Sequence, residues 1–330
     1  MEFAFSEEQA VLAATVRVLL AKRADSAAVR AAVESELGYD QELWQLLCEQ
    51  IGAAALAIPE DYDGAGFSLF ESLIVLEEVG RSLAPSPLLA SLVAAETLLA
   101  SGNAEACARL LPRIAMGEIA TVALDPQLVL HGDQATILLA VVDGALLEVD
   151  VDTVSRTWLE SMDQTIRLAS IDLTGAGTAV VAEDASAAVA RAELVGAVAT
   201  TALQIGLAAR ALDMTVSYSK ERVQFGRPIG SFQALKHRMA DLLVLLEMSR
   251  SASWSASYAV STGADDAAEL THIAKSYCSE ALAKIAGETI QLHGGIAITW
   301  EHDAHLVFKR AHALGELFGA PHEHRALLEL

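Results

Sequence analysis

The chain has 330 residues, 53% of them hydrophobic and only 5% aromatic, so its core is built mainly from Ala, Leu and Val, a composition that favours helices. A formal net charge of -22 disfavours nucleic acid or an anionic membrane surface as a partner, because phosphate binding needs clustered Lys and Arg. The three cysteines are an odd number without CxxC spacing, which disfavours a disulfide framework and a zinc site.

No targeting or membrane-spanning pattern is visible in the sequence. Its start, MEFAFSEEQA, is acidic and lacks the basic region and apolar run of a signal peptide. The longest uncharged run, Leu194 to Ala209, is shorter than the ~20 apolar residues that a membrane span needs. We therefore expect a cytoplasmic protein in which this run forms a buried core helix.

The first expected part of the fold is an N-terminal helical domain over residues 1–118. Its apolar residues recur at helical spacing and are interrupted once, by a Pro, Asp and Gly-rich stretch from Pro59 to Gly66. Ser68, with Glu71 three residues later, predicts the N-terminus of the next helix. Helices then continue to about Gly117.

A small β-domain is expected next, over residues 119–189, because the helical spacing of the apolar residues ends near Glu118. The runs TVALD, ATILLAVVDGALLEVDV, TIRLASIDL and TAVVA are short and rich in β-forming residues. Asp143 and Gly144, between two apolar arms, predict a hairpin turn.

Helical periodicity returns after the β-region and predicts a C-terminal bundle over residues 190–330. Its long segments are expected at about 190–220, 230–262, 266–292 and 302–315. The predicted fold class is therefore mainly α: an N-terminal helical domain, a small central β-domain and a C-terminal four-helix bundle.

Two stretches of the C-terminal part are unusual, whereas the sequence has no Rossmann, Walker or GxSxG pattern in the required context. The first, ERVQFGRPIGSFQALKHRMADL from Glu221 to Leu242, places an Arg, an aromatic residue, two glycines and a proline before a long amphipathic segment. The second, IQLHGGIAITWEHDAHLVFKRA from Ile290 to Ala311, contains paired glycines, which let a backbone approach a flat ligand closely.

These stretches resemble the acyl-CoA dehydrogenase family. RVQFGRPIGSFQALKHRMAD resembles that family's flavin-contacting loop and helix, and QLHGGIAITWEHD resembles its Gly-Gly signature. The order of helices, β-domain and helices also matches, so the likeness covers the whole chain; it is strongest over residues 190–311 and weak over 119–188. The resemblance implies FAD as cofactor, an acyl-CoA thioester as substrate, and an electron-transfer flavoprotein or similar electron acceptor.

The resemblance also implies which residues hold FAD, partly across a subunit boundary. By position they are Arg222, Gln224, Phe225, Gln233, Gln291, Gly294 and Gly295. An Arg fork suits a pyrophosphate, and a Gln amide offers both a donor and an acceptor to adenine. The alternative is that Arg222 is a surface ion-pair partner and Phe225 belongs to the core.

Catalysis in this family is an α,β-dehydrogenation, in which a carboxylate removes the α-proton while the β-hydride leaves for the flavin. In many members the carboxylate lies in a YEGT-like motif, and here Phe318 stands at its position. The resemblance then offers Glu280, on the long helix before Gly294, as the base, with Glu316 as a weaker candidate. Alternatively, Glu280 forms an ordinary i,i+4 surface pair with Lys284.

The β-domain departs from the family pattern, because TVALDPQLVLHGDQ and TVSRTWLESMDQ replace the flavin-facing segments without a convincing match. Related short chains, similar to subunits of actinobacterial sterol-degradation clusters, pair with a longer sister subunit. We therefore keep two alternatives to an FAD-dependent acyl-CoA dehydrogenase: a non-catalytic partner subunit of a heterotetrameric enzyme, and a flavin-free helical binding protein.

No metal site is expected. A site could be assembled from His302, Asp303 and His305, but no HExxH motif or spaced cysteine accompanies them. We therefore expect these histidines to lie at the surface or at an interface.

We predict that the protein is a tetramer, either of identical chains or with a longer sister subunit. The C-terminal helical faces are too apolar for a monomer, and the loop at Arg222 resembles one that crosses a subunit boundary. Light scattering coupled to gel filtration measures the mass directly. A monodisperse species of 34.8 kDa at micromolar concentration would contradict the prediction.

Overall fold

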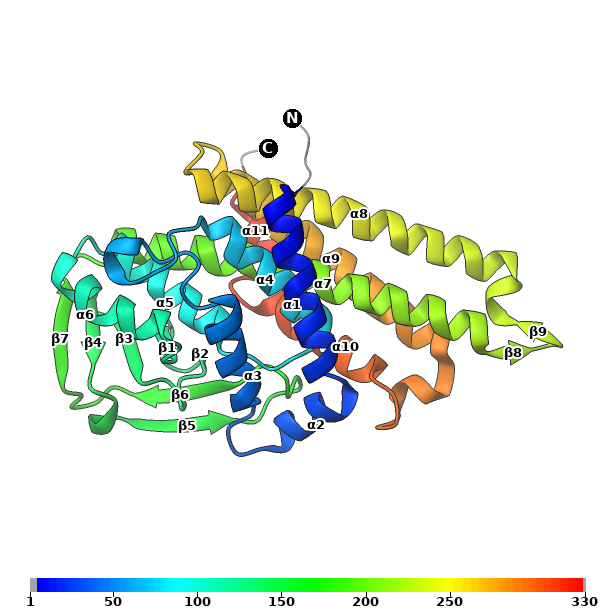
Figure 1. Cartoon of the computed structure of the whole chain (residues 1–330), viewed down its shortest axis with the longest axis horizontal. Helices are drawn as coiled ribbons and strands as arrows, with labels where there is room; N and C mark the ends of the chain where they lie inside the picture. The colour runs from blue at the N-terminus through cyan, green and yellow to red at the C-terminus, as the bar shows by residue number, and fades with distance from the viewer. Residues whose placement is uncertain (1–4, 329–330) are drawn as a thin grey trace. The chain divides into compact units, whose positions relative to one another are not determined.

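The computed structural model describes residues 5–328 (Figure 1). By contact, the chain forms two compact units. Of the described residues, the C-terminal unit comprises Phe5 and Ser6, Leu76–Leu83 and residues 197–328, and the N-terminal unit comprises Glu7–Val75 and Ala84–Gly196. The strands between residues 120 and 182 therefore share a unit with most of the N-terminal helices. The three-part division at residues 118 and 189 stays a prediction.

The N-terminal helices begin where side chains cap the first turn. Asp25, Asp40 and Asn103 each accept a hydrogen bond from the backbone N–H three residues later. The predicted helix start at Ser68 is confirmed, since the Glu71 carboxylate accepts from the Ser68 N–H at 3.0 Å. The elements are α1 (Glu7–Arg23), α2 (Ser26–Glu34), α3 (Gln41–Leu46), η1 (Leu47–Ile51), η2 (Glu60–Tyr62), α4 (Leu69–Ser82), α5 (Leu88–Ala100) and α6 (Ala104–Ala115).

The β-region forms two small sheets in the N-terminal unit, with strand orders β1-β3-β4-β7 and β2-β6-β5. β1 pairs with β3 in parallel, and the remaining pairs of these sheets are antiparallel. The predicted hairpin is confirmed, with Asp143 and Gly144 at φ 50° and 82° between β3 and β4. The strands are β1 (Ala120–Ala123), β2 (Val129–Leu130), β3 (Ile137–Val142), β4 (Ala145–Val149), β5 (Ser155–Leu159), β6 (Leu168–Asp172) and β7 (Thr178–Ala182).

The C-terminal elements agree with the predicted segments to within a few residues. Their bounds are α7 (Ser186–Glu221), β8 (Val223–Gln224), β9 (Arg227–Pro228), η4 (Ile229–Ser231), α8 (Gln233–Thr262), α9 (Ala267–His293), η5 (Gly294–Ile298), α10 (Ala304–Glu316) and α11 (Pro321–Ala326). Within the C-terminal unit, α9 packs against α8, α10 and α11. The predicted class, mainly α with a small β-region, is confirmed.

Helix α7 is long and apolar enough, by length and composition alone, to cross a membrane, yet 89% of its most apolar stretch is buried inside the protein. It behaves as the core helix expected from the sequence. Within the C-terminal unit it approaches α4 very closely, because a methyl group at Gly206 would lie 1.9 Å from the Glu77 carbonyl oxygen. A methyl group at Gly80 would similarly lie 2.2 Å from the Leu203 carbonyl oxygen.

We predict that Gly206→Ala destabilises the protein by about 1–3 kcal/mol or more, because the added methyl group forces the two helix backbones apart. Gly287→Ala is the matched control. Nothing lies within 4 Å of a methyl group at that helical position, so the helix gains propensity without a clash. The midpoint of thermal unfolding checks both, and equal midpoints for the two variants would refute the close approach.

Candidate cofactor-binding site

The loop between α7 and α8 is a tight hairpin with an exposed aromatic tip. β8 and β9 pair through Val223 with Pro228 and Gln224 with Arg227, which leaves a two-residue turn. Phe225 and Gly226 have φ of 54° and 78°, as a type I′ turn requires. A left-handed conformation costs a residue with a side chain about 1–2 kcal/mol. Phe225 is nevertheless 92% exposed, so the alternative that it belongs to the core is wrong.

Contacts with both flanking helices hold this hairpin in place. The Ile229 N–H donates to the Arg222 carbonyl at 2.8 Å, and Gly230 packs on Ser219 so closely that a methyl group there would lie 2.8 Å from the Ser219 carbonyl oxygen. At the start of α8, the guanidinium of Arg227 lies over the Phe232 ring at 4.0 Å. The loop thus returns to α7 before Gln233 begins the next helix.

The polar residues of the loop face solvent. Within residues 5–328, the Arg222 guanidinium makes no hydrogen bond or ion pair, so the surface-pair alternative is not observed. The Gln224 amide donates only to the adjacent Val223 carbonyl, at 2.8 Å. Gln233 is exposed at the first position of α8, where backbone N–H groups lack helical acceptors. An Arg side chain and such N–H groups are both suited to an anion.

The Gly-Gly turn ends α9 with an open surface. Gly294 has φ 69° and ψ -147°, a conformation that only glycine adopts readily. A methyl group at Gly294 or Gly295 would meet nothing within 4 Å. Gln291, one helical turn earlier, is also exposed. A ligand can therefore approach the backbone of this turn directly.

The β8–β9 hairpin and the end of α9 lie at the same end of the C-terminal unit (Figure 1), and side chains connect them. The Tyr218 ring, one turn before Arg222, stacks on the ring of His293 at 4.5 Å. Farther along, Arg238 of α8 forms an ion pair with Glu288 of α9. The structure thus gathers the seven predicted cofactor residues at one exposed end of the helices.

His293 lies buried under the Gly-Gly turn. Its Nδ1 carries a proton, because that nitrogen donates to the Thr289 carbonyl at 2.7 Å. Burial lowers the pKa of His293, which keeps the ring neutral near pH 7. The ring stacks on Tyr218 and meets His302 at 4.6 Å, and Tyr218 and His302 also meet edge-on at 6.3 Å, so three rings in mutual contact lie under Gly294.

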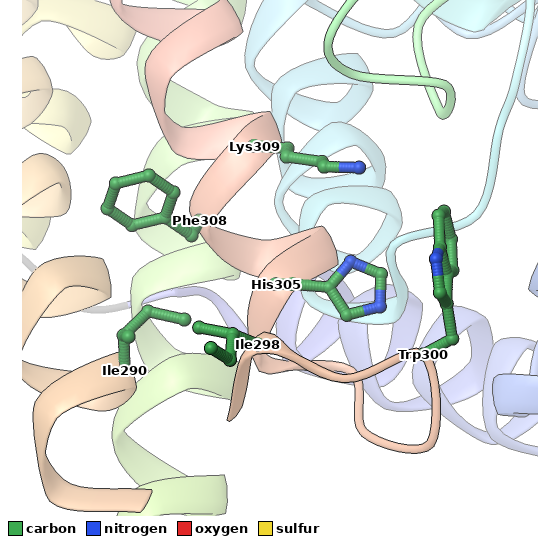
Figure 2. Close-up of a pocket in the computed structure, with 6 residues that line it drawn as sticks. All are labelled: Ile290, Ile298, Trp300, His305, Phe308 and Lys309. Atoms are coloured by element: carbon green, nitrogen blue, oxygen red, sulfur yellow. The ribbon is translucent and has the colours of Figure 1, made fainter. Parts of the chain in front are cut away.

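A cavity of about 390 Å³ lies beside this turn. Figure 2 shows Trp300, His305 and Lys309 on one side of it and apolar side chains on the other. The Lys309 ammonium lies 4.8 Å from the centroid of the Trp300 ring, and His305 meets the same ring edge-on at 4.7 Å. The lining residues are Ile290, Ile298, Trp300, His305, Phe308 and Lys309. Such a cavity accepts a flat apolar group that carries negative charge nearby.

This cavity was not predicted from the sequence. A signal was present, because His305 and Lys309 are four residues apart and face one side of a helix.

Glu280 lies apart from these residues. Its side chain is 58% exposed and forms an ion pair with Arg325 of α11. Eleven residues separate it from Gln291, which corresponds to about 16 Å along the helix axis. Lys284 pairs with Glu288 at 3.1 Å, so the alternative of a surface pair between Glu280 and Lys284 is wrong, and Glu280 pairs with Arg325 instead. The assignment of Glu280 as the base stays a prediction.

The other residues weighed for chemistry lie in different surroundings. Phe318 is half-buried with φ 54°, and Glu316 is exposed. The Asp303 carboxylate accepts a hydrogen bond from Arg210 at 2.9 Å. Among the described residues, no group of three or more His, Cys, Asp or Glu side chains could hold a metal ion.

Comparison with known proteins defines the family. Residues 6–118 match the acyl-CoA dehydrogenase N-terminal domain, and residues 188–328 match the acyl-CoA dehydrogenase C-terminal domain. The chain belongs to the acyl-CoA dehydrogenase family. It is thus an oxidoreductase of a family that uses FAD to dehydrogenate acyl-CoA thioesters at the α,β bond, as the resemblance implied.

Several relatives resemble the chain over nearly its whole length. It is 48% identical over 325 residues to the acyl-CoA dehydrogenase IpdE2 of Mycolicibacterium smegmatis, with 98% of each chain covered. It superposes on a chain of the steroid ACAD Tcur3481-Tcur3483 with a TM-score of 0.88 and 30% identity, covering 97% of this chain and 96% of that one. It also superposes on a chain of the ChsE4-ChsE5 complex of Mycobacterium tuberculosis with a TM-score of 0.90 and 27% identity, covering 99% of this chain and 97% of that one.

The residues at the exposed end of the helices fit the dinucleotide part of FAD. The Arg222 guanidinium suits a pyrophosphate, and the exposed amides of Gln233 and Gln291 suit hydrogen bonds to adenine or ribose. The open backbone at Gly294 and Gly295 allows close approach. None of these groups lies in the core, so ligand binding displaces no internal contact of theirs.

We predict that Arg222→Ala lowers FAD affinity at least about 10-fold, because a hydrogen bond to a charged group contributes roughly 1.5–3 kcal/mol. The flavin absorbance retained after gel filtration, in the chain or in its complex, measures this. Lys220→Ala removes a neighbouring exposed cation and serves as the control, with FAD retention unchanged. Unaltered flavin content in both variants would return Arg222 to a plain surface role.

Proposed function

We propose that this chain acts in the dehydrogenation of a steroid-derived acyl-CoA thioester, as part of a cytoplasmic tetramer that passes electrons to an electron-transfer flavoprotein or similar acceptor. The observation that carries the proposal is the gathering of the seven cofactor residues at one exposed end of the C-terminal unit. Two similar solved structures, the steroid ACAD and the ChsE4-ChsE5 complex, support the substrate class and the assembly from subunits.

In this proposal the chain's own residues bind and orient the cofactor, and bound FAD supplies the hydride acceptor. Arg222 and the start of α8 hold the pyrophosphate, while Phe225 packs against the part of the site formed by a neighbouring subunit. Gln291 and the Gly-Gly turn take the adenosine half. The cavity beside Trp300 offers an apolar lining for the adenine ring.

Glu280 is proposed as the base that removes the α-proton. A carboxylate needs dry surroundings for this task, whereas Glu280 is exposed and paired with Arg325 in the chain by itself. Its role therefore requires that substrate or a neighbouring subunit cover it and that Arg325 release it. No other carboxylate is proposed for the step.

The second candidate function is that of a partner subunit that completes the flavin site of a longer sister chain. The exposure of Glu280 favours it, and so does the segment from Thr121 to Gln134, which by the sequence resemblance replaces a flavin-facing run of the family. In that segment, the two carboxylate oxygens of Asp133 share the single Nε–H of Arg167, at 3.1 and 2.9 Å. The Arg156 guanidinium donates to the carbonyl of Ala135 at 2.8 Å. These groups are thus engaged within the chain.

We predict that Glu280→Gln slows anaerobic flavin reduction by an acyl-CoA at least ~100-fold while FAD stays bound, because the amide keeps the shape and removes the base. Stopped-flow absorbance of the flavin measures the rate. Glu269→Gln, an exposed carboxylate in the first turn of the same helix, is the control and should reduce at the wild-type rate.

Three outcomes separate the candidates. Full-speed reduction of the Glu280→Gln protein eliminates Glu280 as the base. A wild-type chain that gains FAD reduction only when co-expressed with a longer sister subunit supports the partner-subunit role. If the chain holds no flavin, either alone or in such a complex, the result supports the flavin-free binding protein.

A further inference from the structure

The last turn of α10 and the residues that join it to α11 have carbonyl groups bound by three buried side chains. The bonds are Gln204 Nε2 to Leu314 O at 3.0 Å, Lys275 Nζ to Gly315 O at 2.9 Å and to Gly319 O at 2.8 Å, and His324 Nε2 to Phe318 O at 2.9 Å. The donors come from α7, α9 and α11, all within the C-terminal unit. We call residues 314–319 the clamped turn.

Lys275 is the central donor and is fully buried, at 0% exposure. Removing an ammonium group from water costs several kcal/mol, which only good hydrogen bonds offset. Lys275 makes three: the two carbonyl bonds and one to Ser279 Oγ at 3.2 Å. Because α10 ends at Glu316, the ammonium also lies at the negative end of that helix. The charge is therefore held by the backbone of the clamped turn.

The clamped turn keeps a conformation that its own sequence does not favour. Phe318 and Gly319 have φ of 54° and 101°, and the left-handed region is costly for Phe. A methyl group at Gly319 would lie 2.7 Å from His324 Nε2, so His324 packs directly on this backbone. External donors are what hold such a turn.

We propose that Lys275 is a positioning residue, which holds the clamped turn and its Phe318 side chain in the arrangement that binds the acyl-CoA. The link to acyl-CoA rests on the proposed function, whereas the hold on the turn stands on the hydrogen bonds alone. Phe318 occupies the place of the YEGT-like motif, so a shift of this turn moves the residue that stands where the family has its carboxylate.

The charge of Lys275 gives the hold a pH dependence. Burial lowers the pKa of Lys275 from 10.5 to about 8, against the nearby charges of Glu316 and Glu323. When the turn opens, water reaches the amine of Lys275 and its pKa returns to the ordinary 10.5. Between about pH 8 and 10.5, closing the turn therefore releases a proton. Closing is therefore favoured as pH rises from about 8 to 10.5 and is independent of pH below about 8.

The other titratable groups that face the amine do not change charge in this window. Burial raises the pKa of the Cys278 thiol to about 12. Burial lowers the pKa of His324, which is already neutral above pH 7. If the protection of this turn against hydrogen exchange changes between pH 8 and 10, the change therefore reports on Lys275.

Hydrogen exchange of the FAD-loaded protein, read by mass spectrometry over residues 314–320 and corrected for intrinsic rates, tests the hold. Wild-type protection should rise by up to about tenfold per pH unit from pH 8 to 10. Lys275→Met keeps the stem but leaves two carbonyls without a donor, so protection falls at least about tenfold and loses its pH dependence. Lys284→Met, an exposed lysine on the same helix, should match wild type.

Binding of butyryl-CoA and cholyl-CoA, a steroid carboxylate thioester, tests the positioning role. Lys275→Met should weaken acyl-CoA affinity about tenfold or raise KM with little change in kcat, at unchanged FAD content. Wild-type affinity with a loosened turn overturns the positioning role. If the wild-type protein binds neither acyl-CoA, the proposed function and the link to acyl-CoA both fail. The hydrogen-exchange experiment then still decides whether Lys275 holds the clamped turn. If Lys275→Met does not fold, flat wild-type protection between pH 8 and 10 overturns the hold.

Discussion

The burial of α7 is the constraint on which the C-terminal unit depends. Gly206 lets this helix lie against the backbone of α4, and Gln204, two residues earlier, binds Ser279 of α9 and the Leu314 carbonyl of α10. At the far end, Tyr218 stacks on His293 and fixes the Gly-Gly turn relative to the hairpin. One helix thus sets the position of both the predicted cofactor residues and the turn after α10.

Much of the fold could be predicted because apolar residues recur at helical spacing over long segments, and this pattern fits only a helix. The helices after residue 190 are regular, and Asp143-Gly144 and Ser68 with Glu71 are strong local signals. β5 was not predicted as a strand, since most of its residues are exposed and it alternates weakly. The parallel pairing of β1 with β3 depends on tertiary packing, which no local pattern encodes.

The candidate site could be predicted where an unusual set of residues marks the backbone. It could not be predicted where the site depends on contacts between side chains that are far apart in the sequence. Glycines, proline and an aromatic residue marked the hairpin and the Gly-Gly turn. Lys275 was missed because a lysine is normally assigned to the surface. Its helix phase was the available signal, since Thr271, Lys275 and Cys278 all fall on the buried face of α9. The ion pair of Glu280 with Arg325 joins residues 45 apart and could not be read from spacing.

The two-residue hairpin turns at Asp143 and Phe225 share a geometry but differ in the residue that adopts it. At Asp143 a short polar side chain tolerates the left-handed region, whereas at Phe225 a bulky ring opposes it. The contacts of the hairpin with α7 and α8 must therefore offset the conformational cost of Phe225. A glycine would adopt this turn at lower cost, so the chain carries its exposed aromatic ring at the expense of stability.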